Sequence, residues 1–262
     1  CYQVNFAQRF SVATEGNPWQ AYKRLRQLNA APFGAYLNTP YCQIMSSSPE
    51  RFLRVSAGQV ETRPIKGTCP RGEHPIEDMM LAETLHNSAK DRAENLMIVD
   101  LLRNDLGKAC AIGSIHVPEL FKVESFARVH HLVSTVRGRL AEGENCASLL
   151  RACFPGGSIT GAPKRRAMQI IDELEPVRRE AYCGNIIRLG FDGGLDSSIT
   201  IRTLLMQHDT VYYWAGGGIV ADSDCDAEYQ ESLDKAAAFL RLLEGCGDGD
   251  DEWAGVVERI GD

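Results

Sequence analysis

The chain has 262 residues, of which 44% are hydrophobic and 24% are charged, and its formal net charge is −7. This composition is typical of a globular protein that buries one large core or two smaller ones. The acidic balance argues against a protein whose overall field attracts nucleic acid or an anionic membrane, because both are negatively charged. We therefore expect neither nucleic acid nor a membrane among its partners.

No hydrophobic stretch approaches the roughly 18 residues of a membrane-spanning helix, and no signal-peptide pattern opens the chain. The nine cysteines are scattered and include no Cys-x-x-Cys pair, so reduced thiols are expected instead of a disulfide framework or a zinc site. The expected location is the cytoplasm. The chain starts at Cys1 and at once enters a strand-like run with Val4 and Phe6, which indicates a fragment whose N-terminal part is absent.

Short strand-like runs and helices alternate along the chain without internal repeats. The first runs are separated by turn residues such as Pro40, Pro49 and Gly58, a pattern that is typical of an antiparallel meander. The expected strands, in chain order, cover residues 36–37, 42–46, 52–55, 60–62, 114–117, 121–126, 133–139, 185–191, 197–206 and 210–215.

Hydrophobic spacing predicts helices at residues 76–85, 91–106, 146–154 and 227–243, and Pro163 suits the first turn of another that ends before Pro176. The apolar residues of the helix at 91–106 occupy every side of the helical wheel, so this helix should be largely buried. Strands interrupted by helices predict an α+β fold with antiparallel sheets. We expect one domain over residues 1–246 and a frayed acidic tail over residues 247–262.

Lys66 lies in a segment that should hold its amine in one place, because Pro64 and Gly67 restrict the backbone around it. Its neighbour Ile65 is apolar, and desolvation can lower the pKa of a lysine ammonium and make the amine a nucleophile. Taken alone, however, a lysine at the end of a strand more often points into water.

Two pairs of acidic residues share i, i+3 spacing on predicted helices: Asp91 with Glu94, and Glu228 with Glu231. Each pair alone is typical of a solvated helix face, and on the second helix Lys235 would form a surface ion pair with Glu231. Together the pairs also predict a magnesium site. Mg²⁺ takes one or two protein carboxylates and keeps water and substrate oxygens for its other positions.

Two glycine-rich segments could hold an anion on their backbone amides. Residues 154–164 run into a helix start, but Ala162 and Pro163 replace the Lys-Ser/Thr of a phosphate-binding loop, so nucleotide binding is not expected. Residues 216–218 are three glycines whose missing side chains would let a carboxylate approach the main chain. The spacing of each segment alone is that of a turn.

Three polar residues from other segments are further candidates. Arg202 should project from the polar face of the predicted strand at 197–206, where it could bind a carboxylate through two hydrogen bonds or be solvated. His131 could be an acid or hydrogen-bond donor near a leaving group, or a structural histidine. Glu50 follows a Ser-Pro turn and could be a general acid or a cap.

These segments jointly resemble the chorismate-utilising enzymes over nearly the whole chain. The matching blocks are SPERF at 48–52, PIKGT at 64–68, AENLMIVDL at 93–101, RNDL at 103–106, HLVS at 131–134, GAPK at 161–164, IRT at 201–203, GGIV at 217–220 and DS at 222–223. Within that family, a lysine at position 66 makes the chain resemble the aminodeoxychorismate synthase branch, because anthranilate synthases carry alanine at the corresponding position. The resemblance implies two large antiparallel or mixed β-sheets packed face to face with helices on the outside.

The resemblance also implies an activity, in which ammonia replaces the 4-hydroxyl group of chorismate and gives 4-amino-4-deoxychorismate for para-aminobenzoate and folate biosynthesis. Lys66 would attack the ring and form a covalent intermediate. Glu50 would donate a proton to the departing hydroxyl group, and His131 would assist.

The family likewise implies the binding residues. Magnesium would be bound directly by Glu94 and Glu231, and through water by Asp91 and Glu228. The substrate-binding residues would be Ser158, Tyr182, Arg202, Gly217, Gly218 and Lys235.

A separate glutamine amidotransferase subunit would supply the ammonia, since no glutaminase motif is visible in this chain. Two other interpretations stay open. An anthranilate or isochorismate-type synthase would share the magnesium and carboxylate sites but should lack the lysine at position 66. The chain could instead be a non-catalytic chorismate-binding or docking module that has lost its catalytic function through truncation or drift.

Overall fold

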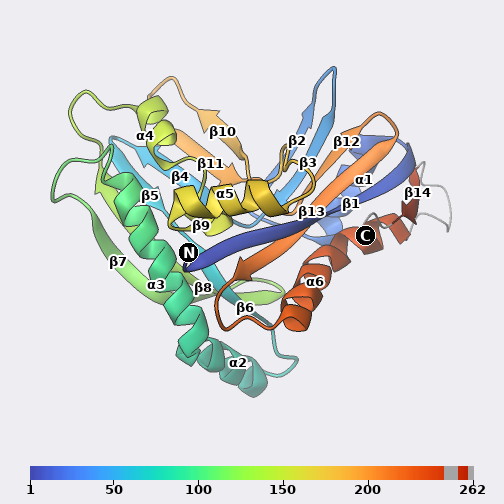
Figure 1. The fold of residues 1–262 in the computed structure, drawn as a ribbon, viewed down its shortest axis with the longest axis horizontal. Coiled ribbons are helices and arrows are strands. Elements are labelled where there is room, and N and C mark those ends of the chain that lie inside the picture. The colour runs from blue at the N-terminus through green and yellow to red at the C-terminus, as the bar shows by residue number, and fades with distance from the viewer. Residues whose placement is uncertain (245–252, 259–262) are drawn as a thin grey trace. The chain divides into compact units, whose positions relative to one another are not determined.

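The computed structural model describes residues 1–244 and 253–258, which form two antiparallel sheets with accompanying helices (Figure 1). The predicted α+β class with antiparallel sheets is confirmed. The chain divides into two compact units. The first unit comprises Cys1–Glu50, Ile159–Ile186 and Ser198–Asp262, and the second comprises Arg51–Ser158 and Ile187–Ser197.

The sheet of the first unit has the order β14-β1-β13-β12-β3-β2, with β9 beside β1. Its long strands, β1 (Gln3–Gly16) and β13 (Thr210–Ile219), pair antiparallel along most of their length. The other strands are β2 (Phe33–Asn38), β3 (Gln43–Ser48), β9 (Gly161–Ala162), β12 (Thr203–Gln207) and β14 (Trp253–Glu258). The strand expected at the start of the chain is therefore present as β1.

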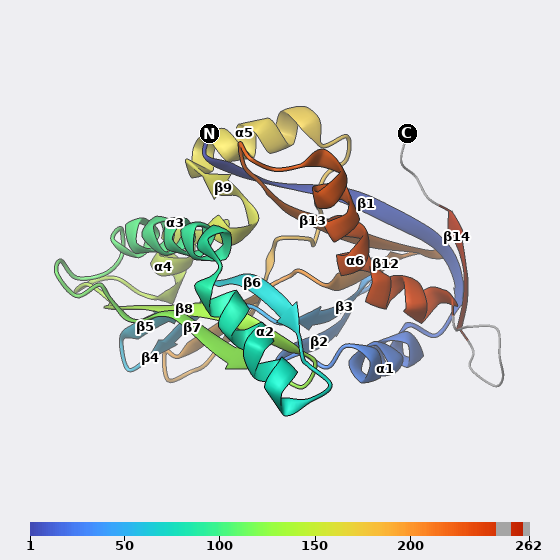
Figure 2. The ribbon, with the colours of Figure 1, turned by 90° about the horizontal axis from the view of Figure 1, so that it is seen from below.

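The helices of the first unit are α1 (Pro18–Leu28), α5 (Lys164–Leu174) and α6 (Cys225–Glu244). Helix α6 lies along β13 (Figure 2), where Phe239 stacks on Tyr213 with ring centroids 4.0 Å apart. The core between the sheet, α1 and α6 consists of buried apolar side chains: Phe10, Ala21, Tyr22, Leu25, Met45, Leu204, Met206, Val211, Tyr213, Ala215, Ala236, Phe239 and Leu242.

The sheet of the second unit has the order β10-β11-β4-β5-β8-β6, with β7 beside β8. Its strands are β4 (Arg51–Ser56), β5 (Gln59–Thr62), β6 (Ile65–Pro70), β7 (His116–Ser125), β8 (Val129–Arg139), β10 (Asn185–Leu189) and β11 (Leu195–Ile199). The helices that follow these strands are α2 (Pro75–Asn87), α3 (Ala89–Leu106), α4 (Cys146–Cys153) and the short 3₁₀ helix η1 (Gly157–Ile159). Helix α3 contacts both β6 and β8, the strands that carry Lys66 and His131.

The prediction of a single strand at residues 197–206 is wrong. The chain pairs as β11 in one sheet and as β12 in the other, and between them it bends at Arg202, whose φ is 49°. Arg202 therefore does not lie on the polar face of a strand. Ile199, Ile201 and Leu205 occupy odd-numbered positions on both sides of the bend, so the spacing of these apolar residues does not reveal it.

Three smaller expectations also differ from the structure. The glycines at 216–218 lie within β13 and pair with β1, so they do not form a turn. Helix α3 is buried on one side only, since Leu96 is 45% exposed whereas Ile98 and Leu102 are buried. The strands expected at 114–117 and 121–126 join as β7, which is irregularly paired with β8.

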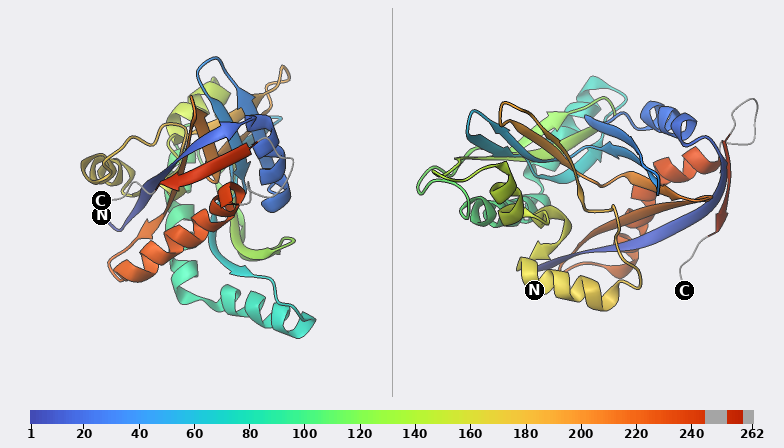
Figure 3. Two further views of the ribbon diagram at one scale, coloured as in Figure 1. Left: turned by 90° about the vertical axis from the view of Figure 1, so that its right-hand side faces the viewer. Right: turned by 90° about the horizontal axis from the view of Figure 1, so that it is seen from above.

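The predicted tail contains a strand, β14, which pairs antiparallel with residues 11–16 of β1 at the edge of the sheet (Figure 3). Trp253, Val256 and Val257 are residue types that favour strands. The expected domain boundary at 246 and the acidic residues of the tail lie outside the described residues: Asp248, Asp250, Asp251 and Glu252.

Within the described part of the chain, no helix combines the length and the apolar character needed to cross a membrane. The cysteines in that part are free thiols.

Candidate functional site

Lys66 lies in a β-bulge of β6. This strand pairs with β8 at Ile65 and again at Thr68, and the register shifts between these pairs, so Lys66 and Gly67 form the bulge. The Lys66 side chain is only 13% exposed, and its Nζ lies 3.9 Å from Oε2 of Glu94 on α3. The amine is therefore held beside a carboxylate and largely away from bulk water.

Gly67 lets the carboxylate of Asp91 approach the backbone of β6. Its φ is 87°, a conformation that favours glycine, and a Cβ on it would lie 2.9 Å from both Cβ and Cγ of Asp91. Asp91 is in the first turn of α3, where its N–H donates to the side chain of the N-cap residue Ser88 at 3.3 Å. Asp91 and Glu94, about one helical turn apart, thus both approach the bulge that carries Lys66.

We expect Gly67→Ala to lower the free energy of unfolding more than Gly58→Ala does. The two glycines have φ values of 87° and 74°, so each alanine would cost on the order of 1–2 kcal/mol of backbone strain. Only the methyl group at position 67 would also displace Asp91, because nothing lies within 4 Å of a Cβ at Gly58. Urea unfolding of both variants measures the difference, and equal losses would contradict the packing of Asp91 on Gly67.

His131 is oriented by Thr68, the residue that follows the bulge. Its Nδ1 lies 2.8 Å from Thr68 Oγ1, and its ring centroid lies 5.3 Å from that of Phe126. The side chain is buried. The second unit therefore places His131 and Lys66 on neighbouring strands of one sheet, with the orientation of the imidazole fixed by a hydrogen bond.

A network around the buried side chain of His130 has no signal in the sequence. His130 Nε2 lies 2.8 Å from Asp78 Oδ1, and His130 Nδ1 lies 2.8 Å from Ser125 Oγ. Arg71 binds Asp78 through two 2.7 Å hydrogen bonds. These bonds, supported by the Gly72 N–H and His130, hold the pKa of Asp78 well below its usual range. The network ties α2 to the ends of β7 and β8.

Ser158 is buried in η1, and its neighbour Gly157 packs on α3. A Cβ on Gly157 would lie 2.5 Å from Cδ2 of Leu101. Because no side chain fits there, the glycine lets η1 rest on the helix that carries Asp91 and Glu94. The substrate contact predicted for Ser158 stays a prediction.

In the first unit, three charged side chains of α6 gather over Gly217 of β13. A Cβ on Gly217 would lie 3.2 Å from Glu228 Oε2, 3.7 Å from Lys235 Nζ and 4.0 Å from Glu231 Oε1. Lys235 Nζ lies 2.6 Å from Glu231 Oε1 and donates to the carbonyl of Gly216 at 3.0 Å. The missing side chain of Gly217 therefore provides the room in which both carboxylates and the ammonium group meet.

Gly218 is covered by the side chain of Gln3 from β1. Gln3 Nε2 lies 1.7 Å from the place that a Cβ of Gly218 would occupy, so only glycine fits beside it. Both polar atoms of the Gln3 side chain are buried and have no hydrogen-bond partner among the described residues. The anion-binding role predicted for the Gly217 and Gly218 amides stays a prediction.

Tyr182 is part of a buried aromatic and ionic cluster in the first unit. It stacks on Trp214 with ring centroids 6.2 Å apart, and the guanidinium of Arg179 lies 5.6 Å from its ring centroid. Burial raises the pKa of the Tyr182 phenol well above its usual range. Its predicted contact with the substrate stays a prediction.

Glu50 is buried at the end of the chain segment that follows β3. Its N–H donates to Ser48 Oγ at 3.2 Å, and its carbonyl accepts from the N–H of Ile199 at 3.1 Å. The Ser48 hydroxyl therefore caps this turn. Arg202 is half-buried at its bend, and its carbonyl accepts from the N–H of Ser47 at 3.0 Å. The chemical roles predicted for both side chains stay predictions.

In the part of the chain that the structure describes, no group of three or more Asp, Glu, His or Cys side chains is arranged to hold a metal ion. Each unit by itself contains a pair of carboxylates beside one lysine, with Lys66 near Glu94 in the second unit and Lys235 near Glu231 in the first. Carboxylate oxygens are hard donors, and Mg²⁺ needs only one or two of them. The donor chemistry therefore fits magnesium, and the four acids remain its predicted ligands.

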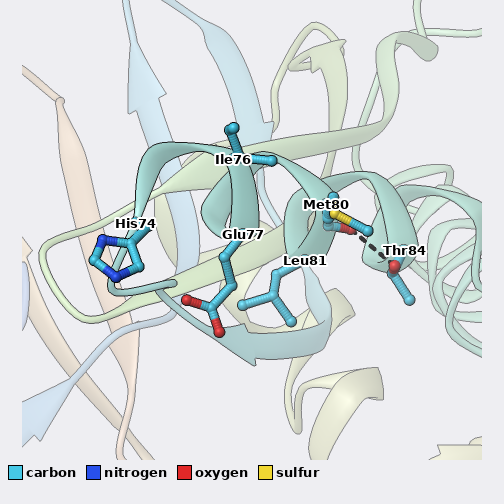
Figure 4. Close-up of a pocket in the computed structure, with 6 residues that line it drawn as sticks. All are labelled: His74, Ile76, Glu77, Met80, Leu81 and Thr84. Atoms are coloured by element: carbon cyan, nitrogen blue, oxygen red, sulfur yellow. Dashed lines mark hydrogen bonds between the residues drawn. The ribbon is translucent and has the colours of Figure 1, made fainter.

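A groove of about 510 Å³ lies along α2 (Figure 4). Its lining residues are His74, Ile76, Glu77, Met80, Leu81 and Thr84. None of them is a predicted site residue, so this groove carries no part of the candidate site.

Comparison with known proteins gives a consistent assignment. The chorismate binding enzyme family matches residues 1–241. Aminodeoxychorismate synthase component 1 of Escherichia coli (strain K12) is 58% identical over 244 residues, which are 93% of this chain and 54% of that protein. Anthranilate synthase component 1 of Bacillus subtilis (strain 168) is 44% identical over 242 residues, which are 92% of this chain and 47% of that protein. The chain thus spans about half the length of these curated relatives.

A solved structure agrees with the sequence relatives. Anthranilate synthase component I from Streptococcus pneumoniae TIGR4 matches with a TM-score of 0.82 and 39% identity, covering 90% of this chain and 52% of that one. The family match covers nearly all of the described residues, and the fold is shared with a structure from the same group of enzymes. The chain belongs to the family of chorismate binding enzymes.

Proposed function

We propose that the chain is the chorismate-binding part of an aminodeoxychorismate synthase, which replaces the 4-hydroxyl group of chorismate by an amino group. The observation that carries the proposal is the Lys66 amine, held in a bulge of β6 at 3.9 Å from Glu94. An amine in such a place can form a covalent bond to a substrate. The higher identity to the synthase component 1 (58%) than to the anthranilate synthase (44%) supports the same choice.

In the proposed reaction, the uncharged amine of Lys66 attacks ring carbon 2 while the hydroxyl group at carbon 4 leaves as water. A carbon–nitrogen bond forms at carbon 2, both conjugated ring double bonds shift, and the carbon 4–oxygen bond breaks as Glu50 donates the proton to the departing oxygen with the help of His131. Ammonia then bonds to carbon 4, both double bonds shift back, and the carbon 2–nitrogen bond breaks to release the Lys66 amine. Two easier displacements replace one difficult displacement.

The substrate is a dicarboxylate, and the proposed binding groups match its charge. Arg202 and Tyr182 would bind the enolpyruvyl carboxylate. The ring carboxylate would be bound by Ser158, the amides of Gly217 and Gly218, and Lys235. When bound, magnesium would neutralise the charge of the ring carboxylate. Its proposed ligands are Glu94 and Glu231 directly, and Asp91 and Glu228 through water.

A partner belongs to this proposal. The name "component 1" of the Escherichia coli relative implies a second component. We propose that the partner of this chain is a glutamine amidotransferase that supplies ammonia, and that both act in the cytoplasm. The product, 4-amino-4-deoxychorismate, would then serve para-aminobenzoate and folate biosynthesis.

Incubation of the protein with chorismate, Mg²⁺ and an ammonium salt is expected to yield 4-amino-4-deoxychorismate, because free ammonia replaces the partner's product. Liquid chromatography with mass detection separates this compound from anthranilate, and reactions without ammonium are the matched control. Formation of anthranilate would place the chain with the anthranilate synthases. Binding of chorismate without any turnover would make the chain a binding module.

A further inference from the structure

Asn95 and Ser134 form a buried polar pair between α3 and β8. Both residues are 0% exposed, and the Ser134 hydroxyl donates to Asn95 Oδ1 at 2.6 Å. Both belong to sequence blocks that match the family, yet neither has a part in the proposed reaction. A fully buried polar pair among apolar neighbours needs an explanation beyond core packing, because an apolar pair would fill the same space without the cost of desolvation.

Ser134 connects the strands on both sides of β8. Its N–H donates to the carbonyl of Pro64 at 3.3 Å, two residues before Lys66. Its hydroxyl accepts from the N–H of Phe121 at 3.0 Å, at the irregular step of β7. The Ser134 side chain therefore replaces a backbone partner that the irregular β7 ladder does not offer. The same residue touches the strand that leads into the Lys66 bulge.

Asn95 fastens α3 to the strand that carries His131. Its Nδ2 donates to the carbonyl of Leu132 at 3.2 Å, while its Oδ1 accepts from Ser134. Asn95 is adjacent to Glu94 in the sequence, and Leu132 is adjacent to His131. The pair thus links the neighbours of two proposed functional groups within the second unit.

Phe121 strengthens this connection. Its φ is 58°, an uncommon value for a residue with a bulky side chain, so the surrounding contacts must hold it there. The guanidinium of Arg92, also on α3, lies 4.9 Å from the Phe121 ring centroid. Helix α3 is therefore tied to β7 and β8 at one point by both polar and ring contacts.

We propose that the Asn95–Ser134 pair is a positioning device that fixes where α3 lies against β6 and β8, and thereby sets the distance between the Lys66 amine and the Glu94 carboxylate. A helix held by apolar contacts alone can shift along the sheet with little loss. Hydrogen bonds have direction, so this pair allows one position of α3. The proposal depends on the proposed function only for the catalytic use of Lys66.

The test compares Ser134→Ala and Asn95→Ala with Ser197→Ala. Ser197 is a matched control because it is also buried in the second unit, where its hydroxyl donates to the Leu53 carbonyl at 3.0 Å and accepts from the Leu53 N–H at 3.1 Å. The first measurement is the rate at which acetic anhydride modifies Lys66 in the folded protein, followed by peptide mass spectrometry. This measurement needs no enzymatic activity.

We expect Lys66 to react several-fold faster in Ser134→Ala and Asn95→Ala than in the parent, because the bulge and α3 lose their fixed contact, and at an unchanged rate in Ser197→Ala. In the amination assay, kcat should fall on the order of 10²-fold, the loss that a displacement of about 1 Å can cause, with little change in the KM for chorismate. Ser134→Cys, which keeps the volume but weakens the hydrogen bond, should show the same direction if Ser134→Ala does not fold.

Equal Lys66 labelling in all folded variants would overturn the positioning proposal. A parent protein that does not aminate chorismate would instead overturn the proposed function. In that case the labelling contrast still decides the role of the Asn95–Ser134 pair.

Discussion

Replacement of Lys66 by alanine is expected to lower the rate of chorismate amination by at least about 10³-fold, because removal of a covalent nucleophile removes the reaction route itself. The amine is held in the bulge of β6 beside Glu94, so a neighbouring side chain should not take over its role without a change in backbone. Initial rates at saturating chorismate, Mg²⁺ and ammonium measure the effect.

Two control variants separate the nucleophile from its charge. Lys66→Arg keeps a positive charge beside Glu94, but its guanidinium stays protonated and cannot attack the ring, so this variant should be as inactive as the alanine variant. Lys122→Ala removes an exposed lysine of the same sheet, which pairs with Glu119, and should retain the parental rate. Parental turnover by either Lys66 variant would contradict the covalent route.

The largest effect on stability is expected for Arg179→Ala, which should lower the free energy of unfolding by about 3–5 kcal/mol. Arg179 Nη2 lies 2.6 Å from Glu175 Oε1, and the two side chains are 14% and 5% exposed. Arg179 also donates to the carbonyls of Ile159 at 2.8 Å and Asn5 at 2.6 Å. Its removal would leave a buried carboxylate without its cation and would remove the Arg179 hydrogen bonds to both carbonyls.

Arg166→Ala is the matched control for this prediction. Arg166 lies on α5 and pairs with Glu173 at 3.0 Å, but these side chains are 51% and 58% exposed, so the loss should stay below about 1 kcal/mol. Urea unfolding followed by circular dichroism measures both variants. Similar losses for the two arginines would show that burial does not govern the contribution of the Arg179–Glu175 pair.

The sequence predicts the elements best where periodicity and turn residues agree. Strands β2 to β5 follow from alternating apolar runs broken by Pro40, Pro49 and Gly58, and each expected strand is present. The predicted single meander is wrong, however, because β2 pairs with β3 in one sheet whereas β4 pairs with β5 in the other. Helix α1 is missing from the expected elements, although its start has a sequence signal. Asn17 is the N-cap, and Pro18 follows it in the first turn. Apolar spacing alone does not predict this helix, because its start is marked by the capping residues.

Periodicity fails where the backbone leaves its usual conformation. The sequence of residues 197–206 predicts one strand, but the chain passes from one sheet to the other at Arg202. Composition does not indicate that an arginine has a positive φ. Residues 216–218 read as a turn because glycine favours turns. In the structure, Gly217 and Gly218 are strand residues that make room for α6 side chains and for Gln3.

The candidate site also contains both residues that the sequence predicts and contacts that it does not predict. The family blocks single out Lys66 and Glu94, and the structure shows that a bulge brings them to 3.9 Å. The contacts of Asn95 with Ser134 and of Asp78 with His130 join residues 39 and 52 positions apart. One sequence cannot reveal such pairs, because neither spacing nor composition encodes contacts between distant strands and helices.

The central claim is that the Lys66 amine forms a covalent bond to the substrate ring, and mass spectrometry of the protein mixed with chorismate and Mg²⁺ but without ammonium tests it most directly. We predict a peptide containing Lys66 whose mass is increased by that of chorismate minus one water, and we predict that added ammonium removes this increase. Formation of 4-amino-4-deoxychorismate by protein in which Lys66 never carries the adduct would contradict the claim.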